Sequence, residues 1–98
     1  MSHYRIRPQS LVRAKLLGVR LRPSTDPTKK IDVLDRDGHF IVAIGDIEDT
    51  DYPTLLELER QGRVGAGTAE RERKAYRKRV GKMAMGSVGW YLGKVLWG

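Results

Sequence analysis

Two stretches of this 98-residue sequence combine residue types and spacing that could bind an ion or a phosphate. The first, DRDG at 35–38, matches part of a calcium-binding loop, in which acidic side chains and a glycine follow a fixed spacing. Such a loop would need its first ligand at Val33 and a glutamate at Ile44, and both residues are apolar. An Asp-Gly pair between apolar runs is typical of a hairpin. We therefore interpret Asp37 and Gly38 as a turn and predict no metal site.

The second stretch, RVGAGT at 63–68, has the glycines of a phosphate-binding loop but lacks the Gly-Lys-Ser/Thr end and the GxGxxG spacing. A flexible joint between helices explains it better. His3 and His39 stand apart and the chain has no cysteine, so no recognisable ligand set for a metal is present. The carboxylates between 32 and 59 show no spacing that identifies a catalytic pair. We expect a protein that is not an enzyme and needs no cofactor.

Charge is arranged in three blocks. Residues 1–30 carry eight Lys/Arg against one acid, residues 31–62 carry two against nine, and residues 63–98 carry nine against two. A protein that bridges other proteins, or that pairs with copies of itself, can use such blocks to set register. Alternatively, the blocks neutralise one another within one fold.

A basic helix is predicted at 69–84, with Thr68 as its cap. Glu70 and Glu72 in its first turn, and cations towards its end, complement the helix dipole. The expected basic docking face consists of Arg73, Lys74, Arg77 and Lys78. It could follow a phosphate backbone through charge alone or bind a protein. Tyr76 is its only aromatic residue, whereas single-strand binders interleave several.

The C-terminal segment at 88–97 is predicted to form an apolar helix capped by Ser87. It is too short to span a bilayer, so we expect a membrane contact to be peripheral at most. Its expected protein-interface residues are Trp90, Tyr91, Leu92, Val95, Leu96 and Trp97. Exposed aromatic area of this size usually marks an interface. These side chains are expected to pack against the domain's own core or against a neighbouring chain.

A hairpin and a short helix must position these residues. A hairpin is predicted at 31–45, with Ile31 and Val33 paired against a strand at 40–44 across a type I′ turn. A short acidic helix is predicted at 53–61.

Residues 1–30 are predicted to form a basic, partly extended N-terminal arm, in which 10–18 could make two helical turns. The predicted fold is a small, single α+β domain at 31–98, with a β-hairpin and two to three short helices behind that arm.

The order of KKIDVLDRDGHFIVAIGD, DTDYPTL, ERKAYRKRV and GSVGWYLGKVLW resembles a family of small basic proteins of large eukaryotic DNA viruses of the phycodnavirus and mimivirus kind. The resemblance covers 29–98, and the chain departs from it at Ile44, Pro53, Val80 and 55–67. The matching residues are Lys29, Lys30, Gly45, Asp51, Tyr52, Tyr76, Arg79, Gly89, Tyr91, Leu96 and Trp97.

The resemblance implies a structural protein of the virion. We expect a minor capsid or cement protein that binds major and minor capsid proteins, with self-association as a further possibility. The alternative is a basic virion protein that binds or condenses DNA through its arm and its basic helix. A linker between capsid and inner membrane is a third interpretation.

Overall fold

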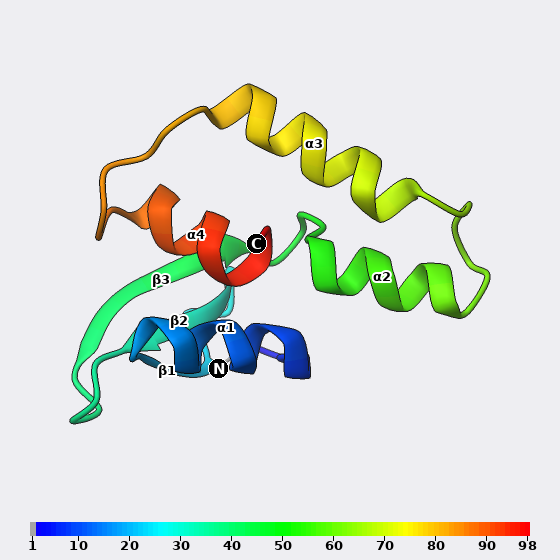
Figure 1. The fold of residues 1–98 in the computed structure, drawn as a ribbon. Coiled ribbons are helices and arrows are strands. Elements are labelled where there is room, and N and C mark those ends of the chain that lie inside the picture. Colours follow the sequence, from blue (N-terminus) through cyan, green and yellow to red (C-terminus); the bar gives the residue numbers. More distant parts are fainter. Residues whose placement is uncertain (1) are drawn as a thin grey trace.

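Residues 2–98, which a computed structural model describes, form four helices and a three-stranded antiparallel sheet (Figure 1). In chain order the elements are α1 (Pro8–Leu17), β1 (Arg20–Pro23), β2 (Lys29–Leu34), β3 (Phe40–Asp46), α2 (Tyr52–Arg60), α3 (Thr68–Val80) and α4 (Val88–Leu96). The strands lie in the order β1-β2-β3, so each strand pairs with its neighbour in sequence. The small α+β fold predicted from the sequence is confirmed.

The hairpin formed by β2 and β3 pairs Ile31 with Ile44 and Val33 with Val42. These alternating side chains face the core because successive residues of a strand point to opposite faces. Ile31, Val33 and Ile44 are fully buried.

The turn of the hairpin differs from the predicted type I′ turn. Among residues 2–98, positive φ is confined to glycines, so Gly38 (φ +87°) adopts it and Asp37 does not. The Gly38 amide donates to the carbonyl of Asp35 at 3.1 Å, and the Asp35 amide donates to the carbonyl of His39 at 2.8 Å. This is a three-residue loop whose last residue is left-handed. The Asp35 carboxylate stabilises it by accepting hydrogen bonds from the amides of Asp37 and His39, both at 2.9 Å.

The prediction of a partly extended arm at 1–30 is wrong for most of that segment. Residues 8–17 form α1, which ends at Gly18 in the left-handed conformation, and β1 joins the sheet beside β2. Ser10 and Ala14 are buried on one side of α1. The arm folds because it completes the core and pairs its charge with the middle of the chain.

The basic helix α3 ends at Val80, four residues before the predicted end at 84. Gly81 (φ +61°, ψ −147°) leaves the helical region. A glycine adopts such a conformation without steric cost, so the chain turns there and residues 81–87 connect α3 to α4.

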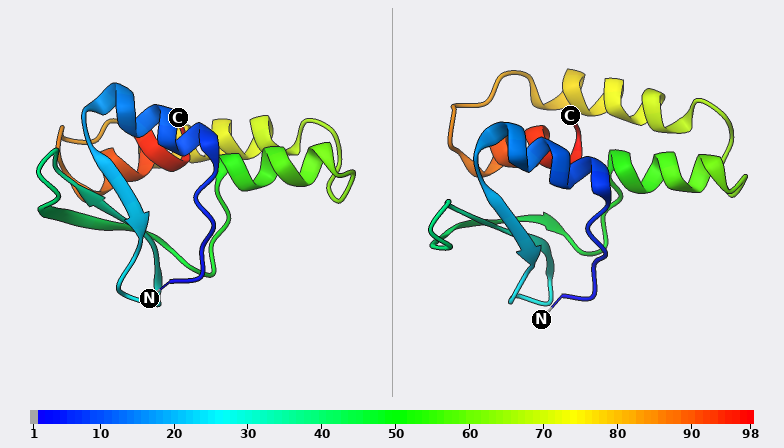
Figure 2. Two further views of the ribbon diagram at one scale, coloured as in Figure 1. Left: turned by 90° about the horizontal axis from the view of Figure 1, so that it is seen from below. Right: turned by 60° about the horizontal axis from the view of Figure 1, so that its bottom comes forward.

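The core lies between the sheet and the helices. α4 packs against β3 and α1, and α2 and α3 run side by side beyond it (Figures 1 and 2). The buried cluster consists of Ile31, Val33, Ile44, Leu55, Ala69, Tyr76, Val95, Leu96 and Trp97. The C-terminal helix therefore supplies a large part of the apolar centre.

Candidate interaction surfaces

The end of α4 lies inside the domain. Val95, Leu96 and Trp97 belong to the buried cluster, and Trp97 is only 8% exposed. A Cβ on Gly45 would lie 2.9 Å from Cδ1 of Leu96, so the tail packs directly on the backbone of β3. Three of the six expected interface residues therefore pack in the chain's own core.

The beginning of α4 is more accessible. Trp90, Tyr91 and Leu92 are half-buried. The rings of Trp90 and Tyr91 meet edge to face with centroids 5.0 Å apart, and Nζ of Lys94 lies 5.9 Å from the centre of the Trp90 ring. These three expected interface residues keep surface that a partner or ligand could contact.

The basic docking face contains three of its four predicted residues. Lys74, Arg77 and Lys78 are exposed on α3. Arg73 instead turns towards α2, so that its guanidinium lies 4.6 Å from the centre of the Tyr52 ring. It also pairs with Glu70 of its own helix at 2.9 Å.

Arg71 takes the place of Arg73 on this surface. It is exposed and lies three residues before Lys74 and seven before Lys78, which puts all three on one side of a helix. That spacing was readable from the sequence. From here on, "the basic face" means Arg71, Lys74, Arg77 and Lys78.

The first two charge blocks neutralise each other. Their interblock ion pairs are Arg5–Glu57, Arg7–Glu57, Arg22–Asp32, Lys29–Asp46 and Lys30–Asp51. In the third block the ion pair among residues 2–98 is Arg73–Glu70, and the basic face carries none. The cations of the basic face thus remain available to a partner.

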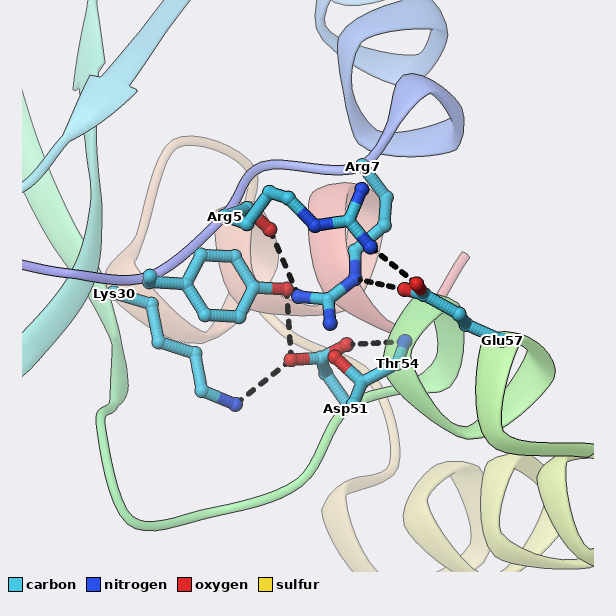
Figure 3. Close-up of polar contacts among 7 residues, drawn as sticks. Arg5, Arg7, Lys30, Asp51, Thr54 and Glu57 are labelled. Carbon is cyan, nitrogen blue, oxygen red and sulfur yellow. Dashed lines mark hydrogen bonds and ion pairs between the residues drawn. The ribbon is translucent and has the colours of Figure 1, made fainter. Parts of the chain in front are cut away.

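A buried polar cluster anchors the N-terminal segment (Figure 3). Nζ of Lys30 lies 2.8 Å from Oδ2 of Asp51, and the Tyr4 hydroxyl donates to the same oxygen at 2.9 Å. Oδ1 of Asp51 accepts the amide of Thr54 at 2.9 Å and caps α2. Burial, followed by the charge of Asp51, raises the pKa of Tyr4 to about 12. These contacts tie the N-terminal segment to β2 and α2, so the cluster acts as a structural lock. The Thr54 hydroxyl is buried and has no hydrogen-bond partner among residues 2–98.

A second group of ion pairs, formed by Arg5 and Arg7 with Glu57, lies beside this cluster. Nε of Arg7 donates to Oε2 of Glu57 at 2.8 Å, and Arg5 binds the other oxygen of the same carboxylate. The hydrogen bond from Arg7 is the main cause of the lowered pKa of Glu57. Sequence reasoning did not assign these partners, because they lie about fifty positions apart in the chain.

The outer side of α1 is an apolar surface that sequence reasoning missed. Leu11, Val12 and Leu16 are 49%, 59% and 76% exposed. Val12 and Leu16 are four residues apart and so neighbours on one face of the helix. The acidic residue nearest to α1 in the sequence is Asp26, so this surface has no acidic side chain of its own helix.

The hairpin loop brings Asp35, Asp37 and His39 together, with potential ligand atoms within 4.8 Å of one another. The amides of the loop already bind the Asp35 carboxylate, and all three side chains are at least partly open to solvent. This arrangement serves the turn, and we assign it no metal.

Among residues 2–98, no helix combines the length and the apolar character needed to cross a membrane. No family model, curated protein or solved structure matches this chain.

Proposed function

We propose that this chain is a small, non-catalytic structural protein that binds neighbouring proteins through the basic face of α3. One observation carries the proposal: the first charge block is paired with the acidic block inside the fold, and the basic face has no ion pair among residues 2–98. A surface of unpaired cations favours an acidic partner, because complementary charge steers and orients association.

Apolar side chains next to α3 favour a protein over a nucleic acid. The connection after α3 exposes Met83 and Met85, and Val88 at the start of α4 is also exposed. Phosphates gain nothing from such side chains, whereas protein interfaces combine apolar centres with charged rims. Methionine in particular adapts to irregular partner surfaces. The partner we propose therefore has an acidic surface beside an apolar one.

The proposal has a more specific form. Following the sequence resemblance, we propose that the neighbours are major and minor capsid proteins, and that the chain is a minor capsid or cement protein in the virion of a large DNA virus. That setting is supported by the resemblance alone. The apolar side of α1 would offer a second contact, as a cement protein needs in order to join two neighbours.

DNA binding is the second candidate function. It is favoured by the spacing of Arg71, Lys74 and Lys78 along one side of α3, since a line of cations can neutralise consecutive phosphates and release their counterions.

The experiment compares two variants with equal loss of charge. The first replaces all four residues of the basic face by Gln. The control replaces Arg20, Arg36, Arg60 and Arg63, which are exposed and lie outside α3. For a cement protein, the wild type and the control remain with emptied shells after the genome is released, and the variant of the basic face does not assemble into shells.

Duplex DNA provides the opposing measurement. If the wild type binds DNA more tightly than about 1 μM at physiological salt, with a steep salt dependence that only the variant of the basic face flattens, DNA binding replaces protein binding as the function.

A further inference from the structure

A cavity of about 240 Å³ lies between α3 and α4, and α1 contributes one side chain to its edge. Three of its lining residues are cations from three different helices: Arg13 of α1, Arg77 of α3 and Lys94 of α4. No acidic side chain among residues 2–98 lines it. Nε of Arg13 donates to the carbonyl of Lys94 at 2.9 Å, which holds Arg13 at this edge. The side chains that line the cavity therefore carry positive charge and no negative charge.

Aromatic rings form a second part of the lining, and Val80, Met83 and four glycines complete it. Tyr76 and Trp97, stacked on each other, and Trp90 line the cavity. Trp90 is half-buried, and Nζ of Lys94 lies 5.9 Å from the centre of its ring, so the ring and the cation lie side by side at the cavity. Flat rings of this kind bind other flat rings by stacking, and a stacked base gains about 1–3 kcal/mol on such a platform. The cavity thus combines a surface for a planar ring with cations for an anion.

One buried polar group at the cavity has no partner. The Tyr76 hydroxyl makes no hydrogen bond among residues 2–98, and it lies 3.6 Å from the position that a Cβ on Gly93 would occupy. Burial raises the pKa of Tyr76, which keeps the hydroxyl protonated as a donor. Leaving a buried polar group unpaired costs free energy. A ligand acceptor would remove that cost.

We propose that this cavity binds a nucleotide unit, with its base against Trp90 and its phosphate among Arg13, Arg77 and Lys94. The ligand class follows from the cations and the aromatic rings of the lining, which suit a dianionic group and a planar ring. The volume lies slightly below the roughly 300–1,000 Å³ typical of drug-sized ligands. A single base and one phosphate therefore fit better than a dinucleotide. The unit could be a free mononucleotide or the 5′-phosphorylated end of a single strand.

This inference goes beyond the proposed function, and the two can fail separately. Arg77 belongs to both surfaces, but Lys94 lines only the cavity and Lys74 lies only on the basic face. Lys94→Gln and Lys74→Gln each remove one lysine charge. Lys94→Gln should weaken nucleotide binding and leave shell assembly intact. Lys74→Gln should weaken shell assembly and leave nucleotide binding intact.

The test titrates the full chain with adenosine 5′-monophosphate and follows tryptophan fluorescence, with calorimetry as a second readout. We expect saturable quenching with a dissociation constant below about 1 mM. Adenosine without phosphate and inorganic phosphate alone should each bind at least about tenfold more weakly, since each offers one half of the recognised unit. Lys94→Gln should weaken binding about tenfold, against less than about twofold for Lys74→Gln.

Tyr76→Phe provides a readout that a purely structural role would not give. Because the hydroxyl has no partner, its removal should leave the midpoint of unfolding unchanged or higher while it weakens binding of the nucleotide. A trinucleotide with and without a 5′-phosphate identifies the source. Tighter binding of the phosphorylated trinucleotide than of the mononucleotide assigns the cavity to a strand end, and the reverse assigns it to a free nucleotide.

Three outcomes would overturn the proposal. The first is the absence of saturable quenching up to about 10 mM nucleotide. The second is equal weakening by Lys94→Gln and Lys74→Gln, which would mean that overall charge and not the cavity binds the anion. The third is inorganic phosphate that binds as tightly as the nucleotide, because the aromatic lining would then contribute nothing.

Discussion

Trp97 stacks on Tyr76, with ring centroids 4.8 Å apart and an angle of 8° between the planes. The pair joins the C-terminal end of α4 to the middle of α3. Offset stacking of this kind adds to the free energy gained from burying the two rings. The basic face of α3 is therefore held in place by a residue one position before the last in the sequence.

Trp97→Ala should lower the free energy of unfolding by about 3–5 kcal/mol, the usual cost of removing a buried tryptophan. Trp90→Ala, at a half-buried position, should cost about 1 kcal/mol, as an ordinary substitution does. Denaturant unfolding followed by circular dichroism measures both. Equal costs would contradict the assignment of Trp97 to the core. Deleting residues 90–98 should unfold the chain, because Val95 and Leu96 leave the core as well.

Substitutions at Gly45 and Gly38 distinguish the cost of a clash with a neighbouring side chain from the cost of positive φ in a residue with a Cβ. Both have positive φ, +76° and +87°. A Cβ on Gly45 would lie 2.9 Å from Cδ1 of Leu96 and 3.1 Å from Cδ of Lys30, whereas a Cβ on Gly38 would have no neighbour within 4 Å. Gly38→Ala should therefore cost about 1 kcal/mol from the backbone alone.

Gly45→Ala should cost more, about 2–4 kcal/mol, because overpacking adds to the backbone term. Thermal unfolding of the two single variants measures the difference. Replacing Leu96 by Ala in the Gly45→Ala background should make the second substitution less costly than it is in the wild type. Identical costs for the two glycine variants would show that Leu96 does not restrict Gly45.

The sequence alone predicts the elements that local signals define. The β2–β3 hairpin, α2 and α4 follow from an Asp-Gly pair, an aspartate cap with a proline, and a serine cap. Such signals act within a few residues. The N-terminal strand β1 has only a short alternation of Val19 and Leu21 with Arg20 and Arg22 as a local signal. Its pairing of Arg20 with Leu34 and of Pro23 with Ile31 depends on the finished sheet. Because the acids that pair with residues 1–30 lie in the next block of the chain, the local sequence predicts an unpaired basic arm.

The candidate surfaces were predictable only in part for the same reason. Periodicity finds the apolar side of α4, but it cannot say whether that side meets the domain's own sheet or another chain. Composition finds the cations of α3, but the turn of Arg73 towards Tyr52 depends on the packing of α2 against α3. The cavity at Lys94 and the exposed side of α1 follow only from the assembled fold.

Lys29 and Lys30 are neighbours in sequence with opposite environments. The Lys30–Asp51 pair is buried, with side chains 3% and 1% exposed, whereas the Lys29–Asp46 pair lies at the surface. Removing one partner of a buried pair leaves an uncompensated charge, so Lys30→Met should cost about 3–5 kcal/mol. Lys29→Met should cost less than about 1 kcal/mol, because solvent already screens its pair.

Tyr4→Phe belongs to the same series. It removes one hydrogen bond to Asp51 but leaves Lys30 and the Thr54 amide in place, so we expect a loss of about 1 kcal/mol. Urea denaturation of the three variants gives the order Lys30→Met, Tyr4→Phe, Lys29→Met from most to least destabilised. If Lys29→Met were as harmful as Lys30→Met, the cluster around Asp51 would not act as the lock that we describe.

The buried carboxyl group of Asp32 makes the free energy of unfolding depend on pH in the acidic range. Burial by itself would raise the pKa of Asp32, but hydrogen bonds from the Ser24 hydroxyl, the Thr25 amide and Arg22 outweigh it and hold the pKa below the usual value. A carboxyl whose pKa is lower in the folded than in the unfolded state contributes stability above its unfolded pKa, about 3.9. That contribution is lost as the pH falls through the lowered pKa of the folded state.

The free energy of unfolding should therefore decline between about pH 5 and about pH 2, and Asp32→Asn should flatten part of that decline while costing stability at pH 7. Ser24→Ala removes the closest donor, at 2.7 Å, so the acid transition attributed to Asp32 should move to higher pH. Urea denaturation at a series of pH values measures both effects. A pH dependence of Asp32→Asn that runs parallel to that of the wild type would show that the protonation of Asp32 does not cause the loss of stability in acid.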